Sequence, residues 1–221
     1  MNKAIENNIE YSERDDPIVT AVIEVTRTFC EYSNGVSIKK MKNLVKHFLS
    51  SLRKEKRWKR QRMAPKLCDY KVYRYYSVGF DFMLEAMLNL QNVSVPQNMQ
   101  CTQSYSLLCE SANTIAIMLN DIASFRNELH EHSKNNMVIV LKQERGYVKY
   151  QDAIDEMVQM LNDEWKNLEL LLKMCSTHNY EMQNSNLNVL DVIKQILHMA
   201  YMYTMNSKRY TFANTFTIEI Q

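Results

Sequence analysis

Glycine and proline are scarce in this chain, whose 221 residues include only 3 of each. Because these residues form most tight turns, a fold with many β-hairpins is disfavoured. The hydrophobic content of 46% is enough for one sizeable core. No internal repeat or low-complexity linker divides the sequence. We therefore predict a single, nearly all-α domain over residues 1–221.

Long uncharged apolar runs are also lacking. No stretch reaches the length of about 20 residues that a membrane-spanning helix needs. Residues 1–8 lack the apolar core of a signal peptide. We expect a soluble, cytoplasmic protein with no membrane span.

The cysteines show neither an even number nor a CxxC spacing. This pattern gives little support to a zinc site or to a disulfide framework. Free thiols of cytosolic chains are usually buried. We expect this at Cys30, Cys68, Cys101, Cys109 and Cys175.

One basic run stands out, because residues 53–62 read RKEKRWKRQR in a chain whose net charge is only +2. Lysines and arginines clustered around an aromatic residue can follow a phosphate backbone. An RNA-binding helix is therefore one interpretation, and it predicts steeply salt-dependent binding. A solvated helix end is the commoner explanation for a single run. On that explanation we expect no nucleic-acid partner.

Apolar periodicity predicts helices over residues 18–33, 38–62, 69–92, 105–131, 150–175 and 189–207. The fourth of them has an apolar stripe that steps by 4, 3, 4 and 3 residues: Leu108, Ala112, Ile115, Leu119 and Ile122. A second, mostly polar stripe holds Asn113, Ile117, Asn120, Ser124 and Glu128. Two faces of different character are what a helix beside a cavity needs.

The clearest chemistry lies in residues 120–128, which read NDIASFRNE. Asn120, Ser124 and Glu128 are spaced i, i+4 and i+8, so they share one helix face. The two ends lie about 12 Å apart along the axis, but the long Glu128 side chain leans back over the turn of Ser124. Oxygen donors of this kind suit Mg²⁺, which is usually shared between a few protein oxygens and substrate phosphates.

This segment resembles the metal-binding motif of class I terpene synthases, Asn/Asp-Asp-Ile/Leu/Val-x-Ser/Thr-x-x-x-Glu, at all five specified positions. Arg74 lies 46 residues before Asn120, at an interval similar to that of the family's diphosphate-sensing arginine. Arg209 and Tyr210 follow Asn120 after 89 and 90 residues, like the Arg-Tyr pair of the family's last helix. The resemblance extends from about Asp16 to Tyr210 and implies a class I terpenoid synthase-like helical bundle.

The resemblance implies a terpene synthase, a carbon–oxygen lyase that ionises a prenyl diphosphate and cyclises the resulting carbocation. Farnesyl diphosphate is the expected substrate, and Mg²⁺ is the expected cofactor, with Mn²⁺ as a second option. Asn120, Ser124 and Glu128 are the implied metal ligands, while Arg74, Arg209 and Tyr210 are the implied diphosphate ligands. Metal ions and guanidinium groups would neutralise the leaving group as its bond breaks.

The resemblance also implies catalytic roles for Arg74, Val78 and Tyr210. Ser77-Val78-Gly79 resembles the family's helix break, whose backbone carbonyl faces the reacting carbon, with Gly79 supplying backbone freedom.

Other positions depart from the family pattern or rest on position alone. The residue before the final Glu of the motif is often Lys in the family and is Asn127 here, so we expect the neighbouring Arg126 to contact the diphosphate instead. Phe80, Phe82 and Tyr203 are candidates for an aromatic wall around the carbocation. Ordinary core packing is the alternative for each of them.

The family's aspartate-rich DDxxD motif would fall before residue 1 at its usual interval, so we expect an N-terminally shortened bundle that lacks the family's first helices. Asp15-Asp16 lies only 59 residues before Arg74, which is too short an interval for that motif. The pair is typical of acids in a loop before a helix. A monomer or homodimer is expected. The alternative function is a catalytically inactive fragment or degenerate relative that acts, if at all, as a helical interaction protein.

Overall fold

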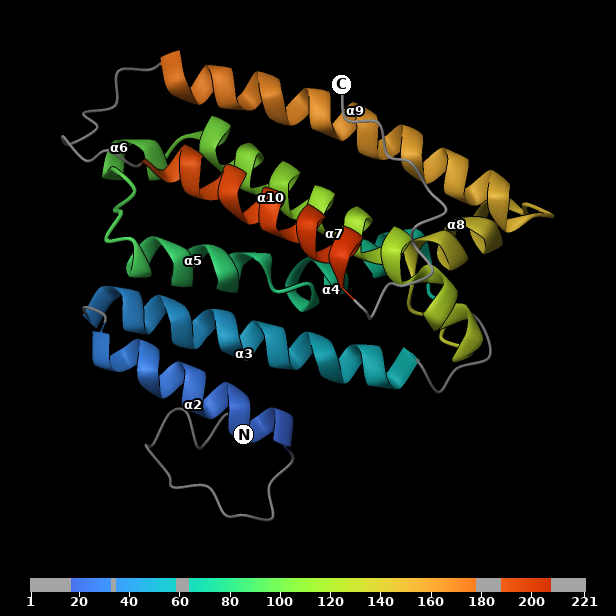
Figure 1. The fold of residues 1–221 in the computed structure, drawn as a ribbon, viewed down its shortest axis with the longest axis horizontal. Coiled ribbons are helices and arrows are strands. Elements are labelled where there is room, and N and C mark those ends of the chain that lie inside the picture. The colour runs from blue at the N-terminus through green and yellow to red at the C-terminus, as the bar shows by residue number, and fades with distance from the viewer. Residues whose placement is uncertain (1–16, 33–34, 59–63, 178–187, 208–221) are drawn as a thin grey trace.

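The computed structural model describes residues 17–32, 35–58, 64–177 and 188–207, and every regular element in these ranges is an α-helix (Figure 1). The all-α prediction is therefore confirmed. The helices are α2 (Pro17–Tyr32), α3 (Gly35–Trp58), α4 (Leu67–Ser77), α5 (Phe80–Leu90), α6 (Gln97–Gln100), α7 (Gln103–His130), α8 (Met137–Arg145), α9 (Tyr150–Thr177) and α10 (Val189–Asn206).

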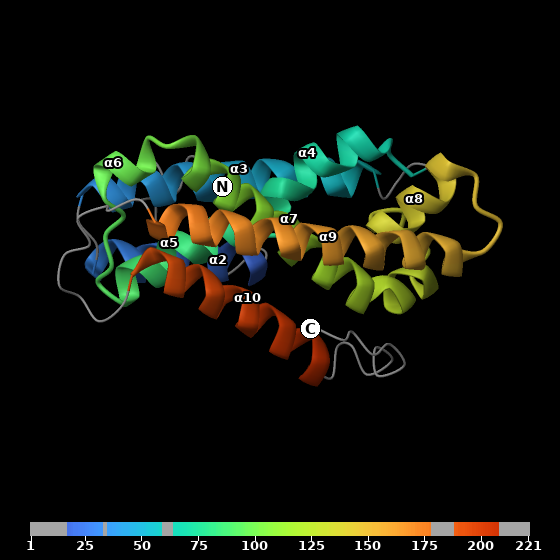
Figure 2. The same ribbon diagram turned by 90° about the horizontal axis from the view of Figure 1, so that it is seen from above.

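Helix α7 is the centre of the bundle and packs against α4, α5, α6, α8, α9 and α10. Its predicted apolar stripe is buried along its whole length, from Leu108 to Ile122. The long helix α9 covers α7 on one side, and α4 and α5 lie on the other (Figures 1 and 2). Helix α7 can therefore direct polar side chains toward α4 and α8 while α9 supports its other side.

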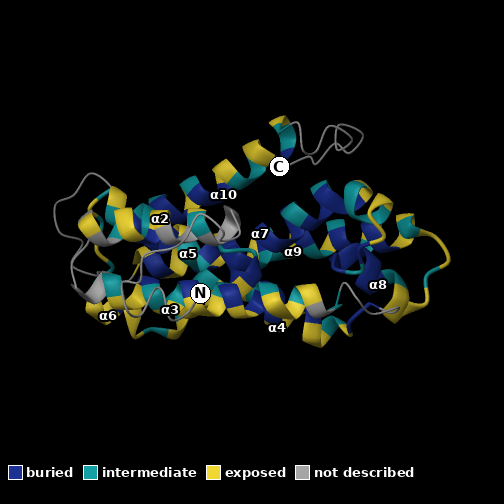
Figure 3. Cartoon of the chain, turned by 90° about the horizontal axis from the view of Figure 1, so that it is seen from below, coloured by how far each residue is buried: buried dark blue, intermediate teal, exposed yellow. Residues whose placement is uncertain are grey.

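Helix α3 lies outside α4 and α5, and α2 lies outside α3 (Figure 1). Helix α3 packs through a separate apolar cluster built on its residues Met41, Val45 and Leu49. Figure 3 shows exposed residues along the outer side of α4 and buried residues along α7 and α8. These layers bring the C-terminal half of α3 alongside α4.

Two differences from the predicted helices bear on the site. The helix expected over residues 69–92 is divided into α4 and α5, as the resemblance implies. Helix α8 had not been predicted, because its first five residues, Met137–Leu141, are all buried and form a continuous apolar run. A short run of this kind carries no helical periodicity. Helix α6 is a single turn and was also missed.

The expectation of buried thiols is only partly correct. Cys175 is buried and Cys109 is half-buried, whereas Cys68 and Cys101 are exposed, so the expectation is wrong for those two. All four are free thiols, and the Cys30 side chain lies outside the described residues. No helix in the described ranges is both long and apolar enough to cross a membrane.

Candidate active site on helices α4, α7 and α8

A break separates α4 from α5 at Val78 and Gly79. The Val78 N–H donates to the Arg74 carbonyl (3.0 Å) and closes the last turn of α4, and Gly79 then adopts φ +80°. Only glycine takes this conformation without strain. A Cβ atom at Gly79 would lie 3.7 Å from the Phe48 ring, which is ordinary contact, so the backbone conformation and not space selects glycine.

The break is fastened to the central helix by a buried amide. Asn113 on α7 is completely buried, and its Nδ2 donates to the Tyr75 carbonyl (3.0 Å) in the last turn of α4. The predicted polar stripe of α7 therefore begins with a residue that holds the end of α4 in place.

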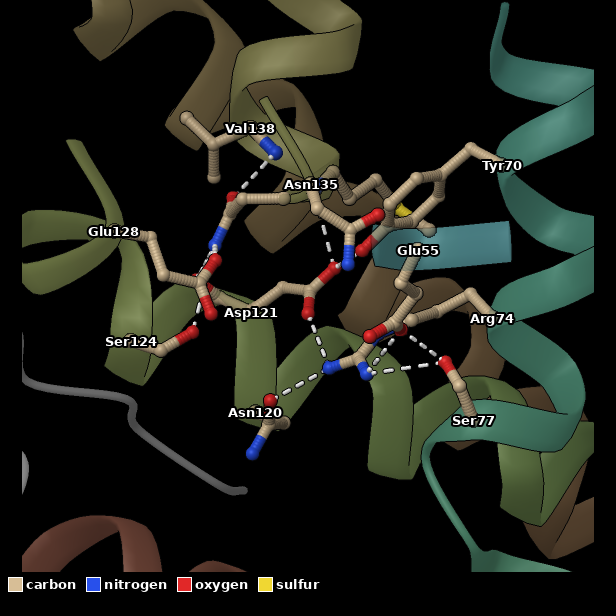
Figure 4. A network of polar contacts seen from close by, with 12 residues as sticks. Glu55, Tyr70, Arg74, Ser77, Asn120, Asp121, Ser124, Glu128, Asn135 and Val138 are labelled. Carbon is tan, nitrogen blue, oxygen red and sulfur yellow. Dashed lines mark hydrogen bonds and ion pairs between the residues drawn. The ribbon is translucent and has the colours of Figure 1, made fainter. Parts of the chain in front are cut away.

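Arg74, in the same last turn of α4, is 8% exposed and joins three helices (Figure 4). Its Nη2 donates to Asn120 Oδ1 (2.7 Å) and to Asp121 Oδ1 (2.8 Å) on α7. Its Nη1 lies 3.5 Å from Glu55 Oε1 on α3 and 3.5 Å from Ser77 Oγ. Burial lowers the pKa of Arg74, but Asp121, Tyr70 and Glu55 outweigh it and hold the group charged.

Asp121 is the buried acceptor at the centre of this network. It is completely buried, and its Oδ2 accepts hydrogen bonds from the Tyr70 hydroxyl and from the Met137 N–H (3.0 Å). Burial, and then the Asp121 charge, raises the pKa of Tyr70, so this hydroxyl remains a neutral donor. One carboxylate thus ties together α4, α7 and the first residue of α8.

Ser124 and Glu128 lie together on the next turns of α7, beside the N-terminus of α8 (Figure 4). Asn136 is completely buried there, and its Nδ2 donates to Glu128 Oε2 (3.0 Å), to the Asp121 carbonyl (2.7 Å) and to Ser124 Oγ (3.5 Å). The structure thus brings Ser124 and Glu128 to one amide, whereas Asn120 contacts Arg74.

Burial, followed by the nearby Asp121 charge, raises the pKa of Glu128 to about 7. Hydrogen bonds from Asn136 and Ser124 and the Arg74 charge act in the opposite direction. A carboxylate that is costly to ionise in its free state gains most from a neighbouring cation.

This pKa predicts a pH dependence of stability for the metal-free protein. The native state binds the Glu128 proton more tightly than the unfolded state does. Protonation of Glu128 therefore stabilises the native state. This contribution to the free energy of unfolding is full below about pH 4.5 and is lost as the pH rises through about 7. The loss amounts to at most about 3 kcal/mol. Urea unfolding of the protein and of Glu128→Gln across this range tests it: the variant should lose this part of the pH dependence, and an unchanged profile would contradict the assignment.

The side-chain types on this face of α7 suit a divalent cation. An amide, a hydroxyl and a carboxylate are hard donors of the kind that Mg²⁺ takes in partial, hydrated sites. Within the described ranges, no three His, Cys, Asp or Glu side chains gather as a metal site. A metal here would therefore depend on the mixed set Asn120, Ser124 and Glu128.

The other predicted diphosphate ligands fall elsewhere. Arg126 is exposed and lines a surface cavity of about 440 Å³ together with Asn127, His130 and Glu131. Its contact with a diphosphate stays a prediction. Arg209 and Tyr210 lie outside the described residues, and so do their predicted roles.

The aromatic candidates have three different environments. Phe80 is buried in the main core, which agrees with ordinary packing. Phe82 is half-buried and packs against the α3 cluster, and Tyr203 is 54% exposed. A wall around a carbocation stays a prediction for these residues.

Several residues of the network were missed from the sequence. Asn136 precedes the apolar run of α8 and caps this helix, since its Oδ1 accepts from the Val138 N–H (2.9 Å). Asparagine is a preferred N-cap residue, so this signal was present in the sequence. Glu55 lies inside the basic run that suggested RNA, yet it binds Ser77 and Arg74. Nothing short of the packing of α3 on α4 could have revealed Glu55.

Comparison with known proteins decides the family. The model for terpene synthase family 2, C-terminal metal binding, matches residues 1–167. The chain belongs to the terpene synthase family. Its similarity to a 4-epi-cubebol synthase of Streptosporangium roseum, described as (2E,6E)-farnesyl diphosphate cyclizing, is 25% identity over 153 residues, or 68% of this chain and 46% of that protein. The chain thus spans less than half the length of this curated relative.

Solved structures show the same fold. A linalool/nerolidol synthase from Streptomyces clavuligerus superimposes with a TM-score of 0.79 at 10% identity, over 92% of this chain and 71% of that one. A 2-methylisoborneol synthase from Streptomyces coelicolor A3(2), in complex with Mg²⁺ and geranyl-S-thiolodiphosphate, superimposes with a TM-score of 0.72 at 14% identity, over 95% and 68% of the chains. The predicted family and the class I terpenoid synthase fold are confirmed.

Proposed function

We propose that this member of the terpene synthase family ionises a prenyl diphosphate, farnesyl diphosphate first among them, in a Mg²⁺-dependent reaction and cyclises the resulting cation. The observation that carries the proposal is the 2.7 Å contact between Arg74 Nη2 and Asn120 Oδ1. It joins the proposed diphosphate sensor to the proposed metal helix. The helix break that carries Val78 follows within one turn of Arg74.

The proposed roles follow from the chemistry of these side chains. When bound, Mg²⁺ supplies positive charge that neutralises a departing diphosphate. Arg74 stays charged and presents a planar fork that suits phosphate oxygens. Asp121 and Glu55 fix the orientation of that fork, so little ordering is left for the moment of reaction. Val78 places a backbone carbonyl at the break, where it would face the reacting carbon.

The proposed ligands of the metal are Asn120, Ser124 and Glu128. Glu128 and Ser124 already share the Asn136 amide, which supports a common site, and the raised pKa of Glu128 supports a cation beside it. Arg126, Arg209 and Tyr210 complete the proposed diphosphate contacts. The farnesyl diphosphate cyclisation of the relative from S. roseum supports that substrate, and the Mg²⁺ complex from S. coelicolor supports the ion.

The experiment is to incubate the purified chain with geranyl, farnesyl and geranylgeranyl diphosphates, with and without Mg²⁺, and to analyse the extract by gas chromatography and mass spectrometry. We expect a Mg²⁺-dependent terpene from farnesyl diphosphate that Glu128→Ala abolishes. Glu110→Ala is the matched control, because Glu110 is an exposed residue of the same helix.

Binding of inorganic pyrophosphate with Mg²⁺, followed by calorimetry, separates the two readings of a negative result. A folded chain that neither forms a terpene nor binds pyrophosphate would contradict the proposal and favour the catalytically inactive relative. A chain that binds pyrophosphate but forms no product would place the failure after binding.

A further inference from the structure

Asn136 makes more contacts than a helix cap requires. Its Oδ1 accepts from the Val138 N–H (2.9 Å) and so caps α8. Its Nδ2 points back to α7 and contacts Glu128 Oε2, Ser124 Oγ and the Asp121 carbonyl. The two ends of one buried amide therefore serve two different helices.

A second asparagine in the chain shows what capping alone looks like. Asn188 caps α10, where its Oδ1 accepts from the N–H groups of Leu190 (2.9 Å) and Asp191 (3.1 Å). Asp191 returns the bond by accepting from the Asn188 N–H (3.3 Å) and completes a capping box. Among the residues that the structure describes, Asn188 makes no contact like those from Asn136 to Ser124 and Glu128.

The turn that carries Asn136 is fixed from both sides. Asn135 accepts a hydrogen bond from the Tyr73 hydroxyl on α4, and the Met137 N–H donates to Asp121 Oδ2 (3.0 Å). The Ser133 N–H donates to the Glu128 carbonyl (2.8 Å) at the end of α7. The Asn136 amide is thus held in position against Glu128 by the surrounding backbone and side-chain contacts.

We propose that Asn136 is a positioning residue that orients Glu128 and Ser124 toward the metal, which makes the α8 N-cap part of the metal site. This inference rests on the proposed function. The glutamate side chain has several rotatable bonds, and a hydrogen bond to one carboxylate oxygen restricts the orientations that the carboxylate can adopt. Partners of this kind outside the ligand set typically contribute 10- to 100-fold, in order of magnitude, to metal affinity.

The test measures the Mg²⁺ dependence of inorganic pyrophosphate binding by calorimetry for the parent chain, Asn136→Ser, Asn136→Thr and Asn188→Ser. Serine and threonine retain a capping acceptor but remove the Nδ2 amide group that donates to Glu128. We expect both Asn136 variants to need about 10- to 100-fold more Mg²⁺ for half-maximal binding. At saturating Mg²⁺ they should bind pyrophosphate as the parent does. Thermal melting without metal reports a change in the stability of the fold separately.

Asn188→Ser is the matched control, with the same change at a cap on another helix, and it should leave the Mg²⁺ dependence unchanged. Equal Mg²⁺ dependence in the parent and the folded Asn136 variants would overturn the positioning role and leave the proposed function intact. Weak binding by those variants that saturating Mg²⁺ does not restore would indicate a general structural role, and would also overturn it. A parent chain that binds no pyrophosphate at any Mg²⁺ concentration would overturn both proposals.

Discussion

Replacing Asp121 with alanine is expected to lower the free energy of unfolding by about 3 to 5 kcal/mol, because it removes one partner of a buried ion pair. Arg74 Nη2, 2.8 Å from Asp121 Oδ1, would remain buried with less compensation. The Tyr70 hydroxyl and the Met137 N–H would also lose their acceptor. Urea unfolding followed by circular dichroism measures the loss.

The matched control is Asp163→Ala on α9. Asp163 also pairs with a cation, Lys166 (3.5 Å), but both side chains are largely exposed. Exposed pairs contribute little to stability, so this variant should unfold like the parent. If the two variants lost the same stability, Asp121 would not be the centre of the network. Asp121→Asn, which retains size and one acceptor, should fall between them.

The residues of α7 could be predicted from the sequence because their pattern is local. A periodicity of 3.6 residues fixes which face is buried, and Asn120, Ser124 and Glu128 follow one another at helical spacing. The same pattern says nothing about what lies opposite them. No role could be predicted for Asp121 within the motif, because its partners lie on α4 and α8.

The partners of the motif depend on packing between distant segments. Glu55 reaches Arg74 only because α3 lies beside α4, and the charges around Glu55 suggested a solvated helix end. Asn136 reaches Glu128 only because α8 begins directly beside α7, and α8 was hidden in an apolar run. The break at Gly79 was foreseen through the resemblance, since a single glycine does not by itself end a helix.

The second large effect is expected at Arg74, where Arg74→Lys should lower the rate of terpene formation by about 100- to 1,000-fold on the proposed function. The charge remains, but lysine carries a single ammonium group on a flexible stem. It cannot reproduce the fork whose Nη2 contacts Asn120 and Asp121 while its Nη1 lies beside Glu55. The fold should survive, because the carboxylates of Asp121 and Glu55 still face a cation.

Arg145→Lys is the control for this substitution. Arg145 lies on α8, its side chain is 46% exposed, and it pairs with Glu156 (3.1 Å) away from the network. Single-turnover rates with farnesyl diphosphate, measured beside melting temperatures, separate chemistry from stability. A parent-like rate in a folded Arg74→Lys variant would show that Arg74 only holds α3, α4 and α7 together. A slow variant with a parent-like melting temperature would place the guanidinium fork in the reaction, because its loss would then affect the departing diphosphate and not the fold.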